Sequence, residues 1–127
     1  MIYVHNERHL QQMGTNEEKF RQLFKQIHTK CWCVVYVTSS YRSTAKQKEL
    51  YKHNHKNAKP GRSPHEFKRA MDINLLTFGG WVRKRDSVDV WKATGAPAVA
   101  KKMGFRWGGN FKSYHDPVHF DVPQLGL

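Results

Sequence analysis

The sequence predicts an α+β fold in which helices flank an antiparallel sheet. Helix-like and strand-like segments follow one another in mixed order along the 127 residues, without the regular strand–helix–strand alternation that builds parallel sheets. No internal repeat or low-complexity segment interrupts them. A chain of this length suffices for one hydrophobic core, so we expect a single domain over residues 1–127 with no room for a second module.

The first half of the chain predicts two helices and a strand. A helix is expected from Asn16 to His28, because apolar residues recur there at helical spacing between polar ones. A buried strand is expected from Trp32 to Thr38, where β-branched and aromatic residues dominate. A second helix is expected from Thr44 to His53, and the breaker-rich residues 57–61 indicate a loop.

The second half predicts a central strand, a broken helix and a short final strand. Residues 70–76 alternate, so Met71, Ile73 and Leu75 are expected to face the core. Helical pattern from Val88 to Met103 is interrupted near Pro97, which favours two helices. In residues 116–122, alternation places His119 and Asp121 on one side of a short strand.

Two distant segments carry residues that together suit a metal ion. If the strands at 70–76 and 116–122 pair, His65, Asp72 and His119 converge, and two imidazoles with one carboxylate are typical of a catalytic zinc site. Asp116, three residues before His119, is then the candidate general base. Spacings of this kind also arise by accident in a chain with 8 His and 10 Asp plus Glu.

Arg42 follows directly on the expected strand at 32–38. Its planar guanidinium is suited to a substrate carboxylate, or to the negative charge that develops on a carbonyl oxygen under attack. Taken alone, Arg42 is interpreted more simply as a surface cation. Near the end of the chain, Trp107 is a candidate wall of a binding cleft, and the two glycines after it let backbone lie close to a bound peptide.

The pattern Ser63-x-His65-x4-Ala70-x-Asp72, followed by Asp116-x-x-His119, resembles the signature of the zinc D-Ala-D-Ala peptidases and L-alanyl-D-glutamate endopeptidases. That group includes many phage endolysins. Further segments are similar to parts of the family pattern, and the resemblance covers about residues 34–122; these segments are Tyr41–Tyr51, Asn57–Ser63 and Trp107–Ser113.

The resemblance implies a fold shared with D-Ala-D-Ala peptidases and hedgehog signalling domains. It also implies a Zn²⁺ cofactor held by His65, Asp72 and His119, with Asp116 and Arg42 as catalytic residues. Three more residues are assigned to substrate binding or to support of the ligands: Ser63, Gln47 and Trp107. Two positions depart from the family pattern. Lys68 stands where glycine is usual and is expected to crowd the turn between the ligands, and Asn110 stands where aspartate is common.

Taken together, these features predict a zinc-dependent peptidase that cleaves a bond in the stem peptide of bacterial peptidoglycan, most similar to an L-alanyl-D-glutamate endopeptidase of endolysin type. Two alternatives stay open: a D,D-carboxypeptidase of the same fold, and a non-catalytic basic module that binds the cell envelope or nucleic acid. The net charge of +12 predicts attraction to a polyanion, for which the anionic cell envelope is a candidate, and no nucleic-acid-binding signature accompanies it.

The remaining expectations concern the cellular setting. No segment approaches the length of a membrane span, and no helix face is surplus to the core, so a monomer is expected. Residues 1–9 show no secretory signal. A phage-encoded protein of this kind is expected to stay in the host cytoplasm until a separate pore releases it to the cell wall or periplasm.

Overall fold

The sheet is built around β3 (Ala70–Thr77), which pairs with three other strands in the computed structural model, where residues 2–124 are described. The strand order is β1-β2-β3-β6-β5, and β4 pairs with the far end of β3. All pairs are antiparallel except β1 with β2. The other strands are β1 (Val4–His5), β2 (Val34–Ser39), β4 (Gly80–Val82), β5 (Arg106–Trp107) and β6 (His119–Asp121).

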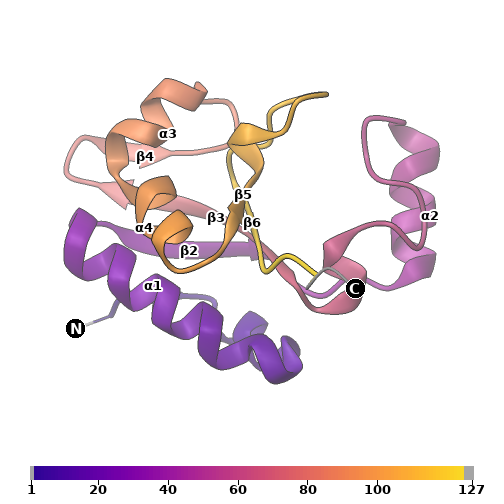
Figure 1. The fold of residues 1–127 in the computed structure, drawn as a ribbon, viewed down its shortest axis with the longest axis horizontal. Coiled ribbons are helices and arrows are strands. Elements are labelled where there is room, and N and C mark those ends of the chain that lie inside the picture. The colour runs from indigo at the N-terminus through magenta and orange to yellow at the C-terminus, as the bar shows by residue number, and fades with distance from the viewer. Residues whose placement is uncertain (1, 125–127) are drawn as a thin grey trace.

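One face of the sheet is covered by three helices, and the other carries the polar residues of β3. Met71, Ile73 and Leu75 are fully buried, as the alternation predicts, and they share one core with the apolar face of α1 (Glu17–Cys31). The other two helices of this layer are α3 (Val88–Thr94) and α4 (Ala96–Lys102). Figure 1 shows α1 and α4 lying in front of the sheet. On the opposite face, Asp72 and Asn74 are half-buried.

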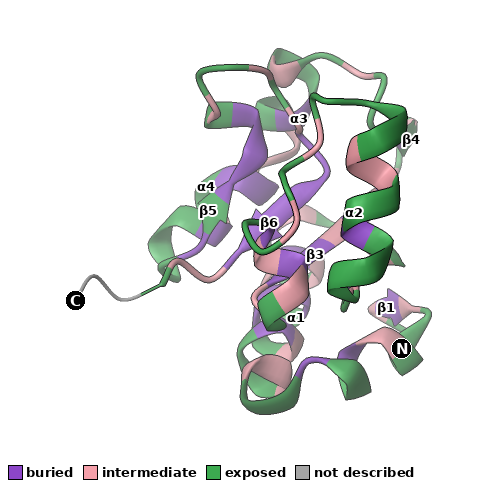
Figure 2. Ribbon diagram, turned by 90° about the vertical axis from the view of Figure 1, so that its right-hand side faces the viewer, coloured by how far each residue is buried: buried purple, intermediate pink, exposed green. Residues whose placement is uncertain are grey.

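The helix α2 (Thr44–His53) stands apart from this core (Figure 1). Gln47 is its one buried residue, and Figure 2 shows the rest of α2 as exposed or half-buried. Four short 3₁₀ helices complete the described residues: η1 (Glu7–Gln12), η2 (Gly14–Asn16), η3 (Pro64–Phe67) and η4 (Gly108–Asn110). None of the helices between residues 2 and 124 is long and apolar enough to cross a membrane.

The α+β fold class is confirmed, with differences at particular elements. The helix at 44–53 and the break between α3 and α4 lie where the sequence predicts them. The first helix is longer than predicted and ends at Cys31, with Trp32 in a left-handed conformation at φ 58°, so β2 begins only at Val34. The parallel strand β1 was not predicted, because two residues are too few to show alternation.

Candidate metal centre

The pairing of β3 with β6 brings two of the predicted ligands together. Asp72 lies opposite His119 in the antiparallel register, so both side chains project from the open face of the sheet. The Nδ1 atom of His119 is 3.4 Å from Oδ1 of Asp72. The neighbouring residues Met71 and Phe120 are fully buried, and their packing fixes this part of the site.

The third predicted ligand, His65, comes from η3, which precedes β3. The Oγ atom of Ser63 caps this turn and accepts a hydrogen bond from the backbone N of His65 at 3.2 Å. The Nε2 atom of His65 is 3.3 Å from Oδ1 of Asp72. Its Nδ1 atom lies 2.7 Å from the backbone oxygen of Ser40, which can only accept, so Nδ1 carries the hydrogen and the lone pair of Nε2 faces the site.

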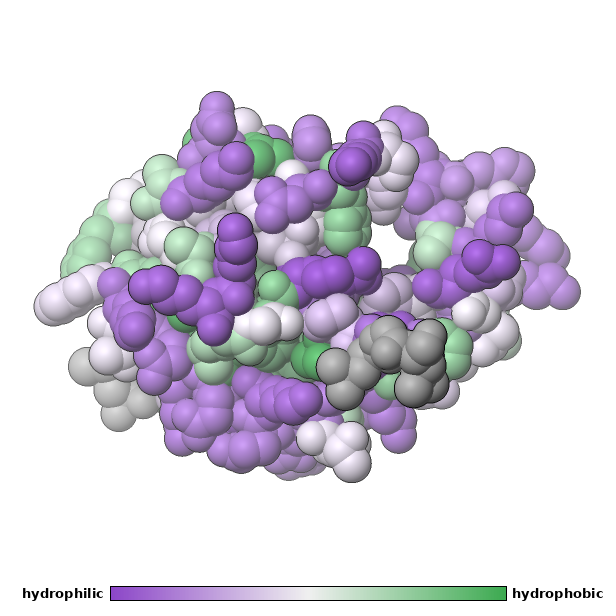
Figure 3. Space-filling model, in the orientation of Figure 1, coloured by the Kyte–Doolittle hydropathy of each residue, from purple (hydrophilic) through white to green (hydrophobic). Residues whose placement is uncertain are grey.

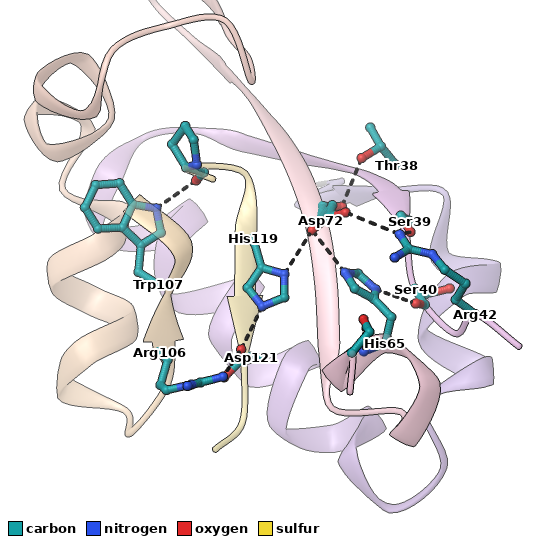
Figure 4. A network of polar contacts seen from close by, with 12 residues as sticks. Thr38, Ser39, Ser40, Arg42, His65, Asp72, Arg106, Trp107, His119 and Asp121 are labelled. Atoms are coloured by element: carbon teal, nitrogen blue, oxygen red, sulfur yellow. Dashed lines mark hydrogen bonds and ion pairs between the residues drawn. The ribbon is translucent and has the colours of Figure 1, made fainter. Parts of the chain in front are cut away.

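His65, Asp72 and His119 each offer one donor atom, and these atoms lie within 4.8 Å of one another (Figure 4). Among the described residues, Oδ1 of Asp72 is buried without a hydrogen-bond partner, although an imidazole nitrogen lies on either side of it. Burial acts to raise the pKa of Asp72, but the two adjacent imidazoles outweigh burial and hold the pKa well below its usual range. An ionised, unpaired carboxylate oxygen between two imidazole nitrogens fits a divalent metal ion.

Behind His119 lies an ion-paired carboxylate. Nε2 of His119 is 2.7 Å from Oδ2 of Asp121, which is fully buried and accepts two further hydrogen bonds from Arg106 at 2.7 and 2.8 Å. Because a carboxylate only accepts, Nε2 carries a hydrogen, and Nδ1 is the nitrogen that faces Asp72 and becomes a ligand once it loses its proton. Burial lowers the pKa of His119, but Asp121 and Asp72 outweigh burial and raise the pKa to about 9.

Asp116, the predicted general base, lies beside this group on the cleft wall. Its Oδ1 atom is buried without a partner among residues 2–124, and burial, followed by the charge of Asp72, raises the pKa of Asp116. Its backbone N donates to the oxygen of Gly108 at 2.9 Å. A Cβ atom at position 108 would clash with the carbonyl oxygen of Asp116 and lie 2.9 Å from Cβ of His119, so only glycine fits there.

The guanidinium of Arg42 is held next to the donors by hydrogen bonds. It donates to Oε1 of Gln47 at 2.9 Å and to Oγ of Ser39 at 3.2 Å, and it lies 4.0 Å from Oδ2 of Asp72. Gln47 also donates to the backbone oxygen of Ala58 at 2.6 Å. Gln47 therefore connects Arg42 to the loop after α2.

Two expectations about this region need correction. Trp107 is buried and is not among the residues that line the cleft; its indole N–H donates to the oxygen of Pro117 at 2.7 Å and so supports the segment before His119. Lys68 does not crowd the ligands, because its backbone adopts the left-handed region at φ 59° and its Nζ atom lies over the ring of Tyr41. The backbone oxygen of Lys68 also accepts from Nδ2 of Asn16 at 2.8 Å.

The cleft around these residues has a volume of about 360 Å³ and a positively charged lining. Four cations line it against the two carboxylates Asp72 and Asp116; the cations are Arg42, Lys56, Lys84 and Arg106. Hydrophilic side chains also cover much of the surface over α1 and α2 (Figure 3). The balance of charge in the cleft favours an anionic ligand.

The sequence assigned no role to Asp121 or Arg106. Alternation did place Asp121 on the same side as His119, which is the one signal that was present. Arg106 lies opposite Asp121 only because β5 pairs with β6, and a pairing between segments more than ten residues apart is not visible in the local pattern.

Comparison with known proteins agrees with this geometry. Residues 56–122 match the sequence model of the D-alanyl-D-alanine carboxypeptidase family. The chain is 31% identical over 100 residues to the peptidoglycan L-alanyl-D-glutamate endopeptidase CwlK of Bacillus subtilis; the match covers 69% of this chain and 60% of the length of CwlK.

Two solved structures share the fold. The L-Ala D-Glu endopeptidase ChiX of Serratia marcescens superposes with a TM-score of 0.68 at 19% identity, over 96% of this chain and 91% of ChiX. The LD-carboxypeptidase LdcB superposes with a TM-score of 0.57 at 20% identity, over 96% of this chain and 61% of LdcB. Since the family model spans more than half of the chain and includes all three donor residues and Asp116, the chain belongs to the D-alanyl-D-alanine carboxypeptidase family of peptidases.

Proposed function

We propose that this protein is a zinc-dependent peptidase that hydrolyses the stem peptide of bacterial peptidoglycan at the bond between L-alanine and D-glutamate. The observation that carries the proposal is the convergence of two imidazole nitrogens on the unpaired Oδ1 atom of Asp72, with Asp116 and Arg42 lining the same cleft. The choice of bond is supported by the similarity to CwlK and ChiX, which are described as endopeptidases of this specificity.

His65, Asp72 and His119 would hold the zinc ion. A zinc ion bound there supplies Lewis acidity, which polarises the scissile carbonyl and lowers the pKa of water to about 7. Two imidazoles and one carboxylate leave a position for water, as in catalytic zinc sites. Cysteine, the common ligand of structural zinc, is absent from the group.

Asp116 would move the proton. Its Oδ1 atom is buried without a partner among the described residues, so it is available to take a proton from the attacking water. The raised pKa of Asp116 makes its carboxylate a stronger base than a solvated aspartate. The same oxygen can then deliver the proton to the leaving amine.

Arg42 would stabilise the negative charge that develops on the carbonyl oxygen. Gln47 and Ser39 fix the guanidinium close to Asp72, so little reorganisation is needed during the reaction. Preorganised donors of this kind act most strongly in a site that excludes bulk water.

The test is to measure zinc content and peptidoglycan cleavage together in wild type, His119→Ala and His53→Ala. His53 is an exposed histidine at the end of α2 and serves as the matched control. We expect near one zinc per chain and release of new amino groups with wild type and the control, and loss of both with His119→Ala. Mass spectrometry of the products then identifies the bond.

Two other outcomes would replace the proposal with a different function. Release of free D-alanine would replace it with the D,D-carboxypeptidase that the family description names. Absence of zinc, combined with tight, salt-sensitive binding to an anionic polymer, would replace it with a non-catalytic binding module.

A further inference from the structure

The proposed function, on which this inference rests, places a carboxylate next to the bond that breaks. In the stem peptide, D-glutamate continues the chain through its γ-carboxyl group, so its α-carboxyl group stays free. The α-carbon that is bonded to the leaving nitrogen therefore also carries a negatively charged carboxylate group. A cleft that accepts this bond must accommodate that charge beside the departing amine.

Of the four cations that line the cleft, two are already engaged. Arg42 is bonded to Gln47 and Ser39 and lies 4.0 Å from Asp72. Arg106 forms a bidentate pair with Asp121. Lys56 and Lys84 take part in no ion pair among the described residues, which leaves these two ammonium groups for a ligand.

Of Lys56 and Lys84, Lys84 lies on the same side of the cleft as Asp116, the proposed general base. Lys84 follows β4, which pairs with β3 just as β6 does, so it belongs to the sheet side of the cleft with Asp116, and its charge acts on Asp116. Lys56 instead follows α2, which stands apart from the sheet (Figure 1). Asp116 returns the proton to the leaving amine in the proposed reaction. A carboxylate one carbon away from that amine would therefore lie within reach of Lys84.

The backbone around Lys84 is well anchored. The backbone N of Arg83 donates to Oδ2 of Asp86 at 2.7 Å, and the indole of Trp91, which is fully buried, donates to the oxygen of Arg83 at 2.9 Å. The guanidinium of Arg83 stacks on Trp81, with 4.7 Å to the ring centroid. The base of the Lys84 side chain is thus fixed at the cleft, while its end is exposed.

We propose that Lys84 binds the free α-carboxylate of the D-residue on the leaving side, and so makes the enzyme prefer substrates in which this group is a carboxylate over those in which it is an amide. A hydrogen-bonded charge pair in a cleft contributes roughly 10- to 100-fold in affinity. A neutral amide cannot replace the carboxylate, because the ammonium group then loses its ionic partner.

The test uses two soluble stem peptides that differ at one group: one contains L-alanyl-γ-D-glutamate and the other contains L-alanyl-D-isoglutamine, in which the α-carboxyl group is an amide. With wild type, we expect kcat/KM to be roughly 10-fold or more higher for the acid. Lys84→Gln should bring the ratio of kcat/KM for the acid to kcat/KM for the amide close to one, mainly through a higher KM for the acid. Lys84→Arg should retain the preference.

Arg85→Gln is the matched control, because it removes the same charge from the adjacent residue, which does not line the cleft. It should leave the ratio between the two peptides unchanged. Equal cleavage of both peptides by wild type, or an unchanged ratio in Lys84→Gln, would overturn the assignment of Lys84 while leaving the peptidase intact. If wild type cleaves neither peptide, the proposed function fails, and the role of Lys84 fails with it.

Discussion

The two sides of the cleft are held in place by different forces. The sheet half, which consists of β3 and β6 with Asp72 and His119, is fixed by strand pairing over a fully buried core. The loop half, residues 40–68 with Arg42 and His65, includes a helix that buries only one side chain. Burial therefore positions two of the three donors, and hydrogen bonds position the residues that would meet the substrate.

A single carboxylate organises much of the loop half. Glu66 accepts hydrogen bonds from the backbone N of Gly61 and of Ser63 and from Oγ1 of Thr44, at 2.8 to 3.2 Å. These bonds tie the start of α2 to the turn that carries His65. Segments with few buried apolar contacts open at lower free energy than a core. We therefore expect the loop half to open locally while the sheet half stays folded.

The largest expected effect comes from breaking the support of His119 in the sheet half. Asp121→Asn removes the charged acceptor behind Nε2, so the imidazole loses the fixed orientation and the hydrogen position that leave Nδ1 free. We expect zinc affinity to fall by roughly 10- to 100-fold. Competition with a chelator measures it, and Asp89→Asn, an exposed carboxylate of α3, is the control. Equal affinity of Asp121→Asn and wild type would mean that strand pairing alone orients His119.

The pH dependence of zinc binding tests the same half without mutation. In the metal-free protein His119 has a pKa of about 9 and is protonated at neutral pH, so zinc must displace a proton. Apparent affinity should rise about tenfold per pH unit up to about pH 9 and then level off. Asp72, whose pKa is lowered, stays ionised throughout.

Between pH 6.5 and 9 the metal-free protein should lose stability, whereas the zinc-loaded protein should stay about level, because its His119 binds no proton in either the folded or the unfolded state. A pKa raised from 6.5 to about 9 in the folded state stabilises the metal-free protein fully below pH 6.5, and this contribution is lost as the pH rises through about 9. Melting temperatures of the metal-free and zinc-loaded proteins at pH 6, 7.5 and 9 measure both trends. Parallel trends in the two forms would contradict the displacement of a proton from His119.

In the loop half, the corresponding test is Glu66→Gln, which weakens the hydrogen bonds that Glu66 accepts. It keeps the shape of the side chain but weakens the hydrogen bonds to Gly61 and Ser63, each of which is worth about 1 to 2 kcal/mol more with a charged acceptor. We expect kcat/KM to fall roughly tenfold, while the melting temperature of the whole chain changes little. The exposed Glu49→Gln on α2 is the control. A large loss of global stability would show that the two halves unfold together.

The smallest expected effect is a change in stability from substitution of Lys68, which lies in the turn between His65 and Asp72. Its left-handed backbone costs a residue with a Cβ about 1 kcal/mol or more, whereas glycine takes this conformation freely. Lys68→Gly should therefore raise the free energy of unfolding by about 0.5 kcal/mol, after the greater entropy of glycine in the unfolded chain is subtracted. Urea denaturation measures it. Lys68→Ala, which keeps the Cβ, should bring no gain, and an equal gain in both would point to the lysine charge instead.

The sheet half was more predictable from sequence than the loop half. Alternation in residues 70–76 and 116–122 was sufficient to place Asp72 and His119 on one face, because each strand buries its other face. The hydrogen bonds of Glu66 and the pair of Arg106 with Asp121 depend on the meeting of distant segments, and composition does not encode them. For the same reason Trp107 was expected as a wall of the cleft, although its partner Pro117, ten residues away, places it in support of the segment before His119.

Gly108 limits which substitutions the site can tolerate during evolution. The carbonyl oxygen of Asp116 occupies the space that any side chain at position 108 would need. Every codon change that replaces this glycine is expected to displace Asp116 and His119 at once, although residue 108 itself offers no functional group. Natural drift and randomised libraries should thus spare a position without a side chain as strictly as they spare the histidines, while the exposed residues of α2 vary freely.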